Sequence, residues 1–357
     1  MRIRARSVHA FFLVGILVGT SGVSQVLQNP AKPASENAGR VLKLKEVWRI
    51  TDEAGKFFLK WPSALQIAGD GSVLLADEGE LLKFSSEGKF LQNLYKEGQG
   101  PGEIASNFIY SIGAGKIYVW DTGSAKLFWT DLDGRLIHQT GLTGGWHSDF
   151  LGVWGDGFLF IDQVPPPVSE QNDKLFDFPL NLNWVSSDGA KSRNLHVFKT
   201  KIFLTPRSRT TWDGSFFAFS PDSGRIYASC AREYLIEVFD CGKERPLQAF
   251  KREYRSVPYK EKGWENSFYK TYNVPKIRIE RDIEKIFVAG KNLWVQTSTK
   301  DAAKGSLFDL FNENGRFIDS FYIGLGRTLM ACREGDLFIQ EKNPDETYRI
   351  VKYRIEK

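Results

Sequence analysis

One short strand pattern occurs six times along the chain, and this repetition limits the possible folds more than any other feature of the sequence. Each copy is rich in β-branched and aromatic residues, which favour strands, and most copies follow a turn that contains glycine. A third strand is expected after every copy, and a fourth strand after the first five. The copies are Ser72–Asp77, Lys116–Asp121, Gly157–Asp162, Arg225–Cys230, Asn292–Thr297 and Asp336–Glu341. The sequence thus predicts six antiparallel units of four strands, the last of which lacks one strand.

The missing strand has a candidate near the other end of the chain, in the strand-like segment Val41–Ile50. If this segment completes the sixth unit, the sheets close into a ring without an open end. The units average about 53 residues, close to the roughly 40–50 residues of propeller repeats. A β-sandwich would explain alternating strands but not six matching units. We therefore predict an all-β six-bladed β-propeller over residues 41–357, with four-stranded antiparallel blades, the last closed by the N-terminal strand 41–50.

Parts of these repeats resemble a known family. The segments 73–90 and 118–136 are similar to NHL-type repeats. The loop Glu97-Gly-Gln-Gly-Pro-Gly-Glu-Ile104 and the segment 274–295 resemble motifs of exported bacterial proteins described as six-bladed β-propellers. The resemblance covers nearly all of residues 41–357. It implies the fold and export, and it implies no reaction because most members of that family have no assigned activity.

The N-terminus has the order of a secretory signal: arginines at positions 2, 4 and 6, an apolar run from Ala10 to Val18, and small residues up to Ser24. We predict a signal peptide over residues 1–24 and a loose linker over 25–40, which places the mature protein in the periplasm or outside the cell. A run extended to Leu27 would instead suit an uncleaved membrane anchor. No cysteine follows the run, so the sequence offers no lipoprotein anchor.

Export also changes the charge argument. Three of the 48 Lys and Arg residues, and none of the 43 Asp and Glu residues, lie in residues 1–24, so the net charge of +5 falls to +2. A nearly neutral chain gives no global electrostatic case for binding nucleic acid. The three cysteines allow at most one disulfide, and hairpin register makes a bridge between Cys230 and Cys241 doubtful.

Binding residues are expected on one face of the ring. In a four-stranded blade, the loops from the second to the third strand and the loops that lead to the next blade emerge on the same side, which we call the interblade-loop face. Its predicted interblade loops are 98–107, 142–149, 200–211, 251–281 and 324–328. The candidate ligand- or partner-binding residues on them are Gln99, Glu103, Trp146, His147, Arg207, Arg209, Trp264 and Arg327.

These residue types suit recognition, although each also has a structural explanation. An aromatic ring beside a histidine suits sugar or peptide contact, and arginine forks suit anions. Gln99 and Glu103 lie in a glycine-rich loop that lacks the spacing of a phosphate-binding loop and is well explained as a tight turn. Isolated surface histidines and arginines are also common, so the alternatives stay open at this stage.

Two insertions interrupt the repeats, at 163–180 and 251–281. Within the first, Gln163–Lys174 contains three consecutive prolines and is expected to be an extended loop. The second holds nine Lys or Arg residues against four Glu and six aromatic residues. Basic residues with stacking rings are typical of nucleic-acid binding, but Glu261–Tyr272 also fits an amphipathic helix with Trp264, Phe268 and Tyr272 facing the propeller. Export favours the helix, packed as a flap beside the channel mouth.

No catalytic motif is present in the sequence: His-Glu-x-x-His, Gly-x-Ser-x-Gly and a Cys/His pair at recognisable spacing are all missing. Asp77, Asp121 and Asp162 end equivalent strands and are expected to accept turn hydrogen bonds. We therefore predict a rigid binding platform, monomeric and without cofactor or metal, for a protein or small-molecule partner. The alternatives are a calcium-dependent hydrolase or lyase with its metal in the channel, and an RNA-binding NHL-like propeller.

Overall fold

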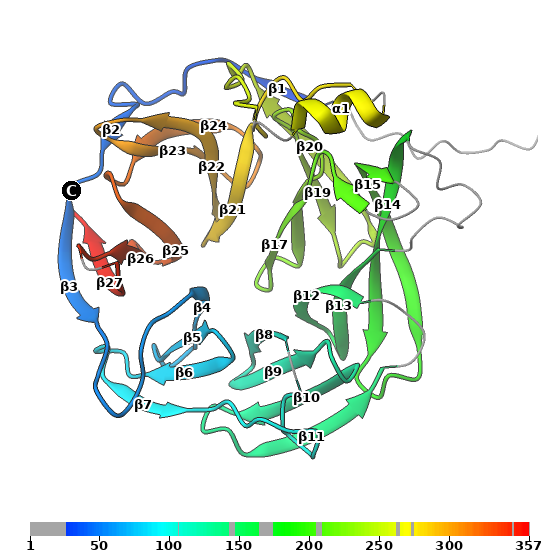
Figure 1. The fold of residues 1–357 in the computed structure, drawn as a ribbon, viewed down its shortest axis with the longest axis vertical. Coiled ribbons are helices and arrows are strands. Elements are labelled where there is room, and N and C mark those ends of the chain that lie inside the picture. The colour runs from blue at the N-terminus through cyan, green and yellow to red at the C-terminus, as the bar shows by residue number, and fades with distance from the viewer. Residues whose placement is uncertain are drawn as a thin grey trace, which may run out of the picture.

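The computed structural model describes residues 26–105, 107–142, 147–163, 174–204, 209–261, 265–272, 275–344 and 346–356. Six antiparallel sheets are arranged in a ring, and the first strand of each sheet lies nearest the centre (Figure 1). The six-bladed β-propeller predicted from the repeats is therefore confirmed. The predicted signal peptide lies outside the described residues. No helix in the described part of the chain is both long and apolar enough to span a bilayer.

The first three blades follow one another along the chain. Blade one contains β4 (Pro62–Ile67), β5 (Val73–Asp77), β6 (Glu80–Phe84) and β7 (Phe90–Asn93). Blade two contains β8 (Phe108–Gly113), β9 (Lys116–Asp121), β10 (Lys126–Asp131) and β11 (Leu136–Gly141). Blade three contains β12 (His147–Trp154), β13 (Gly157–Gln163), β14 (Lys174–Ser186) and β15 (Ser192–Leu204), with β16 (Arg209–Thr211) added at its edge.

The other three blades each include a strand from the N-terminal region. Blade four contains β17 (Phe216–Ser220), β18 (Arg225–Ser229), β19 (Ile236–Asp240) and β20 (Arg245–Arg252), and β1 (Leu27–Asn29) joins it. Blade five contains β21 (Ile283–Ala289), β22 (Asn292–Asp301), β23 (Gly305–Phe311) and β24 (Phe317–Tyr322), and β2 (Arg40–Val41) joins it. Blade six contains β25 (Arg327–Arg333), β26 (Asp336–Lys342), β27 (Tyr348–Ile355) and β3 (Leu44–Ile50).

The ring closes where the two ends of the chain meet. Strand β3 pairs antiparallel with β27, from Ile50 opposite Ile350 to Leu44 opposite Ile355. The predicted closure by the N-terminal strand is confirmed, but the closing strand starts at Leu44. Val41 belongs to β2 and pairs with Tyr322 of the preceding blade.

The prediction of a loose linker over residues 25–40 is wrong. Residues 26–43, which we call the N-terminal strap, run along the outer strands of blades four and five, and β1 and β2 pair parallel with β20 and β24. The side chain of Asn29 is buried, donates to the carbonyls of Lys251 and Gly315, and accepts a hydrogen bond from the Phe317 amide. An outer strand carries unpaired backbone groups, and the strap satisfies part of them.

The hydrophobic core is divided into clusters that lie between neighbouring blades. Between blades five and six, for example, Phe308 and Trp294 pack with Leu337 and Val351. Between blades six and one, Ile350 packs with residues of blade one such as Phe84. Comparable clusters join the other neighbouring pairs. Because each blade buries both of its faces against its neighbours, the ring holds the interblade loops on a rigid base.

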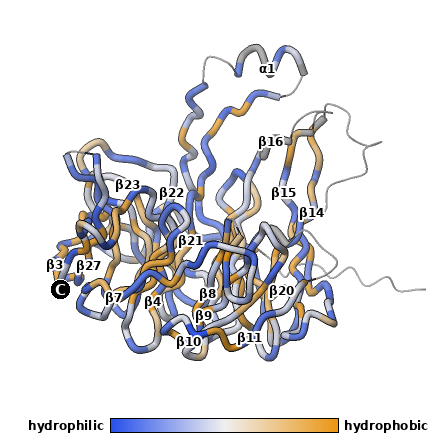
Figure 2. The backbone as a smooth tube through the Cα atoms, turned by 60° about the horizontal axis from the view of Figure 1, so that its bottom comes forward, coloured by the Kyte–Doolittle hydropathy of each residue, from blue (hydrophilic) through white to orange (hydrophobic). Residues whose placement is uncertain are grey.

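Two elements rise above the ring on the interblade-loop side, as Figure 2 shows: the extended hairpin β14–β15 with β16, and α1 (Glu265–Tyr272). A small cluster of Phe203, Trp212 and Tyr269 joins them, with the Trp212 and Tyr269 rings 6.2 Å apart. The predicted helix is confirmed but begins at Glu265 rather than Glu261. Residues 164–173 of the predicted extended loop Gln163–Lys174 lie outside the described residues. The rest of the insertion 163–180 is strand, because β14 begins at Lys174 and pairs with β15 along its length.

Candidate functional site

The interblade-loop face carries three open cavities among the described residues. One, of about 270 Å³, lies beside the loop between β3 and β4 and is lined by residues such as Phe58 and Glu80. A second, of about 410 Å³, lies at the loop before β25 and includes Arg327 and Glu341. The third, of about 530 Å³, is the largest of these three and forms a groove between blades four and five. Its size falls within the range of small-molecule and side-chain sites.

Buried aspartates fix the loops of this face. Asp77, at the end of β5, accepts hydrogen bonds from the backbone amides of Lys60 and Trp61 in the loop that leads into blade one. Asp121, at the equivalent place in blade two, accepts from the amide of Ala105 at 2.8 Å. The predicted role of these two residues as turn acceptors is confirmed. Asp162 accepts a hydrogen bond from the side-chain amide of Asn183 on the neighbouring strand.

The most exposed large apolar side chains of the described chain lie in interblade loops. Phe58 is 54% exposed, Trp61 67% and Leu325 65%. Trp61 has one ring neighbour, Tyr348, with the centroids 6.2 Å apart. Sequence reasoning missed all three residues. The available signal was that each stands outside the alternating strand pattern, with no strand position that would bury it.

The predicted glycine-rich loop lies near the outer strands of blade two. The Glu103 carboxylate accepts a hydrogen bond from the Gly100 amide at 2.8 Å, and the Gly102 amide donates to Gln139 of β11. Lys126, at the start of β10, donates a hydrogen bond to the Gly100 carbonyl. These contacts direct Glu103 into its own loop, while Gln99 is exposed. These contacts agree with the tight-turn interpretation of the loop, and a role of Gln99 and Glu103 in binding stays a prediction.

Several predicted site residues fall outside what the structure describes. Trp146, Arg207 and Trp264 lie outside the described residues, and His147 and Arg209 are placed only as backbone of β12 and β16. Their proposed role in binding stays a prediction. The structure does not bring the eight predicted residues together in one described cluster.

Arg327 is placed on the predicted face, but its guanidinium is already occupied. It donates through Nε to Glu341 at 2.9 Å, through Nη1 to the Ile323 carbonyl and through Nη2 to the Tyr353 hydroxyl. Arg349 donates two further hydrogen bonds to the other carboxylate oxygen of Glu341. The prediction of a free anion-binding guanidinium at Arg327 is wrong, because this guanidinium forms an ion pair with the buried Glu341 carboxylate directly opposite on β26.

The Glu341 carboxylate is therefore fully satisfied: Oε1 accepts from Arg327 and from the Tyr353 hydroxyl, and Oε2 accepts twice from Arg349. Burial alone would raise the pKa of this carboxyl. The hydrogen bonds from Tyr353, Arg349 and Arg327 outweigh burial and hold the pKa of Glu341 below its usual value. We call these four side chains the Glu341 cluster.

The blade four–five groove contains a carboxylate in the opposite situation. Its walls come from the strap, β20, the loop after β18 and the segment before β21, and include Asn29, Glu233, Arg252, Glu253, Ser256 and Asp282. Asp282 is 2% exposed, and its Oδ2 accepts hydrogen bonds from the Tyr234 amide and the Ser256 hydroxyl. Its Oδ1 is buried and accepts no hydrogen bond from any described residue.

Burial raises the pKa of the Asp282 carboxyl, and the nearby charge of Glu233 adds to this effect. The hydrogen bonds from Ser256 and Tyr234 and the charge of Arg252 offset part of it. Arg252 is itself committed to the fully buried Asp309, with Nε 2.7 Å from Oδ2. Asp282 thus keeps a buried acceptor without a described donor, and a carboxylate charge that is offset only in part by Arg252, which is already paired with Asp309.

The opposite face, formed by the turns between the first and second strands, also has cavities. The larger, of about 640 Å³, lies at the mouth of the central channel and is lined by residues such as Gln66, Phe219 and Cys332. Gln66 bridges β4 and β8 through hydrogen bonds to Tyr110 and Ile112, and is not free for a ligand. The three cysteines are free thiols, and burial raises the pKa of Cys332 to about 12, which keeps this thiol protonated.

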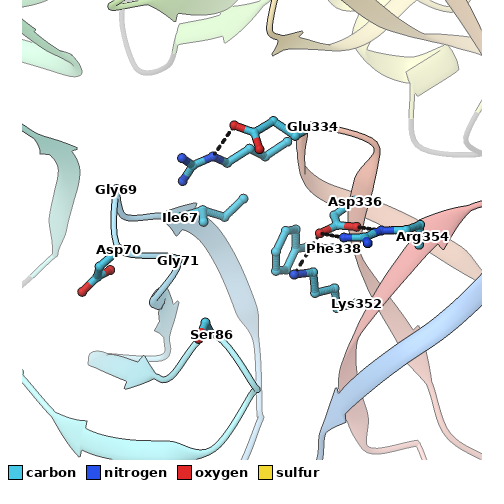
Figure 3. Close-up of a pocket in the computed structure, with 11 residues that line it drawn as sticks. Ile67, Gly69, Asp70, Gly71, Ser86, Glu334, Asp336, Phe338, Lys352 and Arg354 are labelled. Atoms are coloured by element: carbon cyan, nitrogen blue, oxygen red, sulfur yellow. Dashed lines mark hydrogen bonds and ion pairs between the residues drawn. The ribbon is translucent and has the colours of Figure 1, made fainter.

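A smaller cavity of about 280 Å³ adjoins the channel mouth between blades one and six. Figure 3 shows Asp336 at its wall, between Lys352 and Arg354. The Asp336 carboxylate is 2.9 Å from Lys352 Nζ and 2.7 Å from Arg354 Nε. The charged groups of this cavity are therefore largely paired with one another. In the described part of the chain, no three His, Cys, Asp or Glu side chains gather as the ligands of a metal ion would.

Comparison with known proteins agrees with this geometry. No protein-family model and no curated protein sequence matches the chain. A protein from Bacteroides fragilis NCTC 9343 that is described as exported superposes with a TM-score of 0.56 at 14% identity, covering 93% of this chain and 100% of that one. A member of the DUF4221 family from Bacteroides vulgatus superposes with a TM-score of 0.57 at 12% identity, covering 89% and 98%. The chain shares their fold.

This likeness concerns the architecture alone, because the sequences are far apart. A gluconolactonase from Xanthomonas campestris superposes less well, with a TM-score of 0.48 at 13% identity over 91% of this chain. That value is too low to bear on activity. The NHL-like detail of the repeats stays a prediction.

Proposed function

We propose that this protein is an exported binding protein, in which the propeller holds the interblade-loop face rigid for a protein partner. The observation that carries the proposal is the position of Phe58, Trp61 and Leu325, which are more than half exposed and all lie in interblade loops. The other exposed large apolar residues of the described chain lie on outer strands of the blades. Exposed apolar and aromatic side chains of this size are typical of interaction sites.

The shape of the face supports the same proposal. The hairpin β14–β15 and α1 rise on this side of the ring and form a raised wall over blades three and four (Figure 2). A partner seated on the face would contact both the wall and the exposed side chains. Because the loops rest on a rigid base, binding would require little ordering of the backbone, and so would lose little free energy to entropy.

Export is supported by the N-terminal sequence. Charged residues, an apolar run and small residues follow one another in the order of a secretory signal. The shared fold of a Bacteroides protein described as exported is consistent with this proposal. The partner would then be a protein of the same extracytoplasmic compartment.

The proposal is tested by cross-linking the mature protein, from residue 25 onward, to proteins of the extracytoplasmic fraction of the source cells and mapping the protected surface by hydrogen exchange. A double variant, Trp61→Ala with Leu325→Ser, should lower the yield of the specific complex by about tenfold or more. The matched control, Leu91→Ser with Ile137→Ser on outer strands, should leave the yield unchanged. Equal yields for both double variants, or protection confined to the opposite face, would contradict the proposal.

A further inference from the structure

Two inner strands, β12 of blade three and β21 of blade five, each carry an unpaired charge near the interblade-loop face. Asp149 is the third residue of β12, and Lys285 is the third residue of β21. Neither side chain forms a hydrogen bond or an ion pair with a described residue, and Lys285 Nζ lies 5.0 Å from the centroid of the Phe287 ring. The neighbouring Glu284, by contrast, is paired with Lys300 at 3.2 Å. The two strands therefore present opposite charges that the described protein leaves without partners.

Asp149 and Lys285 lie at the same level of the ring. Asp149 pairs with Ile161, and Lys285 pairs with Gln296. Ile161 and Gln296 are the second-last residues of two equivalent copies of the repeat, so their partners on the inner strands are equivalent as well. A β-bulge precedes each charged residue, and bulges of this kind redirect side chains near functional sites.

Blade four, which stands between blades three and five, adds an aromatic ring and a third charge at this level. Its inner strand β17 follows β12 and precedes β21 around the central opening (Figure 1). Phe216 begins β17 and pairs with Ser229, the second-last residue of the blade-four copy. The guanidinium of Arg281 lies over the Phe216 ring, 4.8 Å from its centroid, without a described carboxylate partner. A Cβ atom at Gly214 would collide with Arg281 Nη1, so this glycine leaves room for the guanidinium.

Solvent reaches these side chains inside the ring. Lys285 is exposed, and Asp149, Phe216 and Arg281 are partly exposed. The surrounding protein nevertheless lowers the pKa of Lys285 and raises the pKa of Asp149, and burial is the cause in both cases. A side chain that is open to solvent and yet surrounded by protein stands in a recess, which on an inner strand is the central channel. Neither charge shifts the pKa of the other, so the two groups are too far apart to pair directly.

We infer that the interblade end of the channel binds a small zwitterion, an amino acid or short peptide, whose ammonium group contacts Asp149 and whose carboxylate contacts Lys285 and Arg281. A neutral ligand would leave both charges unpaired, and an ion of one sign would pair only one of them. A zwitterion pairs both, and charge-assisted hydrogen bonds are roughly twice as strong as neutral ones. Phe216 lies on the blade between them and offers an apolar ring to the side chain of the ligand.

The experiment is calorimetric titration of the mature protein at neutral pH with L-leucine and with L-leucyl-L-leucine, which carry the two charges at different separations. We expect at least one of them to bind, and the tighter of the two identifies the source as an amino acid or a peptide. Its N-acetyl and C-terminal amide derivatives each lack one charge and should bind roughly ten- to a hundred-fold more weakly.

Two variants assign the ends of the ligand. Asp149→Asn should weaken binding of the zwitterion by a similar factor and have much less effect on the N-acetyl derivative, which has no ammonium group to lose. Lys285→Gln should weaken the zwitterion likewise and have much less effect on the amide derivative. Arg281→Gln should weaken the zwitterion by a few-fold.

Asp222→Asn with Lys291→Gln is the matched control, because it removes one charge of each sign from exposed turns on the opposite face. It should leave binding unchanged. No heat from either zwitterion, or equal binding by the native protein, Asp149→Asn and Lys285→Gln when circular dichroism shows all three folded, would overturn the inference. The proposed function is judged separately, because the variant that tests it changes loop residues and leaves these channel residues in place.

Discussion

Glu341 and Asp282 are both buried carboxylates beside interblade loops, and they differ in how many donors surround them. Glu341 accepts four hydrogen bonds from Arg327, Arg349 and Tyr353. Asp282 accepts two, both on one oxygen, and its second oxygen has no donor in the described structure. The difference teaches that charge and position on the favoured face do not identify a binding site.

The largest expected effect is the loss of the Glu341 cluster. Glu341→Ala leaves two partly buried guanidinium groups without their carboxylate and should lower the free energy of unfolding by about 3 kcal/mol. Urea denaturation monitored by circular dichroism measures the change. Glu346→Gln, whose side chain is 83% exposed, should change stability by less than about 0.5 kcal/mol. A loss at position 341 no larger than that of the control would show that the cluster is not the structural centre we describe.

The N-terminal strap borders the groove of Asp282 but not the Glu341 cluster, so it sharpens the comparison. Asn29→Ala removes two donated hydrogen bonds and one accepted from the Phe317 amide, and should destabilise the protein by about 1–2 kcal/mol. Hydrogen exchange should accelerate in β1 and β20 and stay unchanged in β27. Gln28→Ala, on an exposed neighbour, should have little effect. Faster exchange spread evenly over all six blades would contradict a local role for the strap.

Asp282→Asn is expected to act in the opposite direction to Glu341→Ala. It removes a buried charge that lacks a full set of partners while it keeps the acceptor for Tyr234 and Ser256. The variant should therefore be more stable than the native protein by about 1 kcal/mol at neutral pH. The same urea titration measures the gain. A loss of 2 kcal/mol or more would mean, as an order of magnitude, that Oδ1 has a protein donor in solution.

The smallest effect is the pH dependence of these two differences. The pKa of Glu341 is lowered in the folded state, so its contribution is present above the unfolded pKa of about 4.3 and is lost as pH falls through the folded pKa. The pKa of Asp282 is raised, so its protonated form stabilises the fold below about pH 3.9, and this contribution is lost as pH rises through the folded pKa.

The advantage of Asp282→Asn over the native protein should therefore shrink as pH falls through the raised pKa of Asp282, and the deficit of a Glu341→Gln variant should shrink as pH falls below about 4.3. Chemical denaturation at several pH values between neutral and about pH 3 checks both changes. A difference that grew on acidification for either variant would contradict the assigned environment of that carboxyl.

The ring and its closure were predictable because they depend on a periodic pattern that repeats six times. The strap was not, because β1 and β2 have only three and two residues and carry no alternation of their own. Arg327 was expected to have a guanidinium free to bind an anion, because its pairing with Glu341 depends on an irregular strand register. A bulge between Leu329 and Ala331 shifts the β25–β26 pairing by one residue and brings Arg327 opposite Glu341.

The buried oxygen of Asp282 that has no described donor was not predictable for a related reason. Its surroundings come from blade four, the loop after β20 and the strap, which are far apart in sequence and meet only when the ring has closed. Phe58, Trp61 and Leu325 lie in loops, where no periodicity separates a buried position from an exposed one. The repeat therefore predicts the scaffold, and the binding groups have to be found in the structure.

The most direct test of the binding face is hydrogen exchange of the mature protein alone and in its cross-linked complex with an extracytoplasmic partner. We predict slower exchange in the interblade loops that carry Phe58, Trp61 and Leu325, and unchanged exchange in the turns of the opposite face. Protection confined to the opposite face would contradict the account.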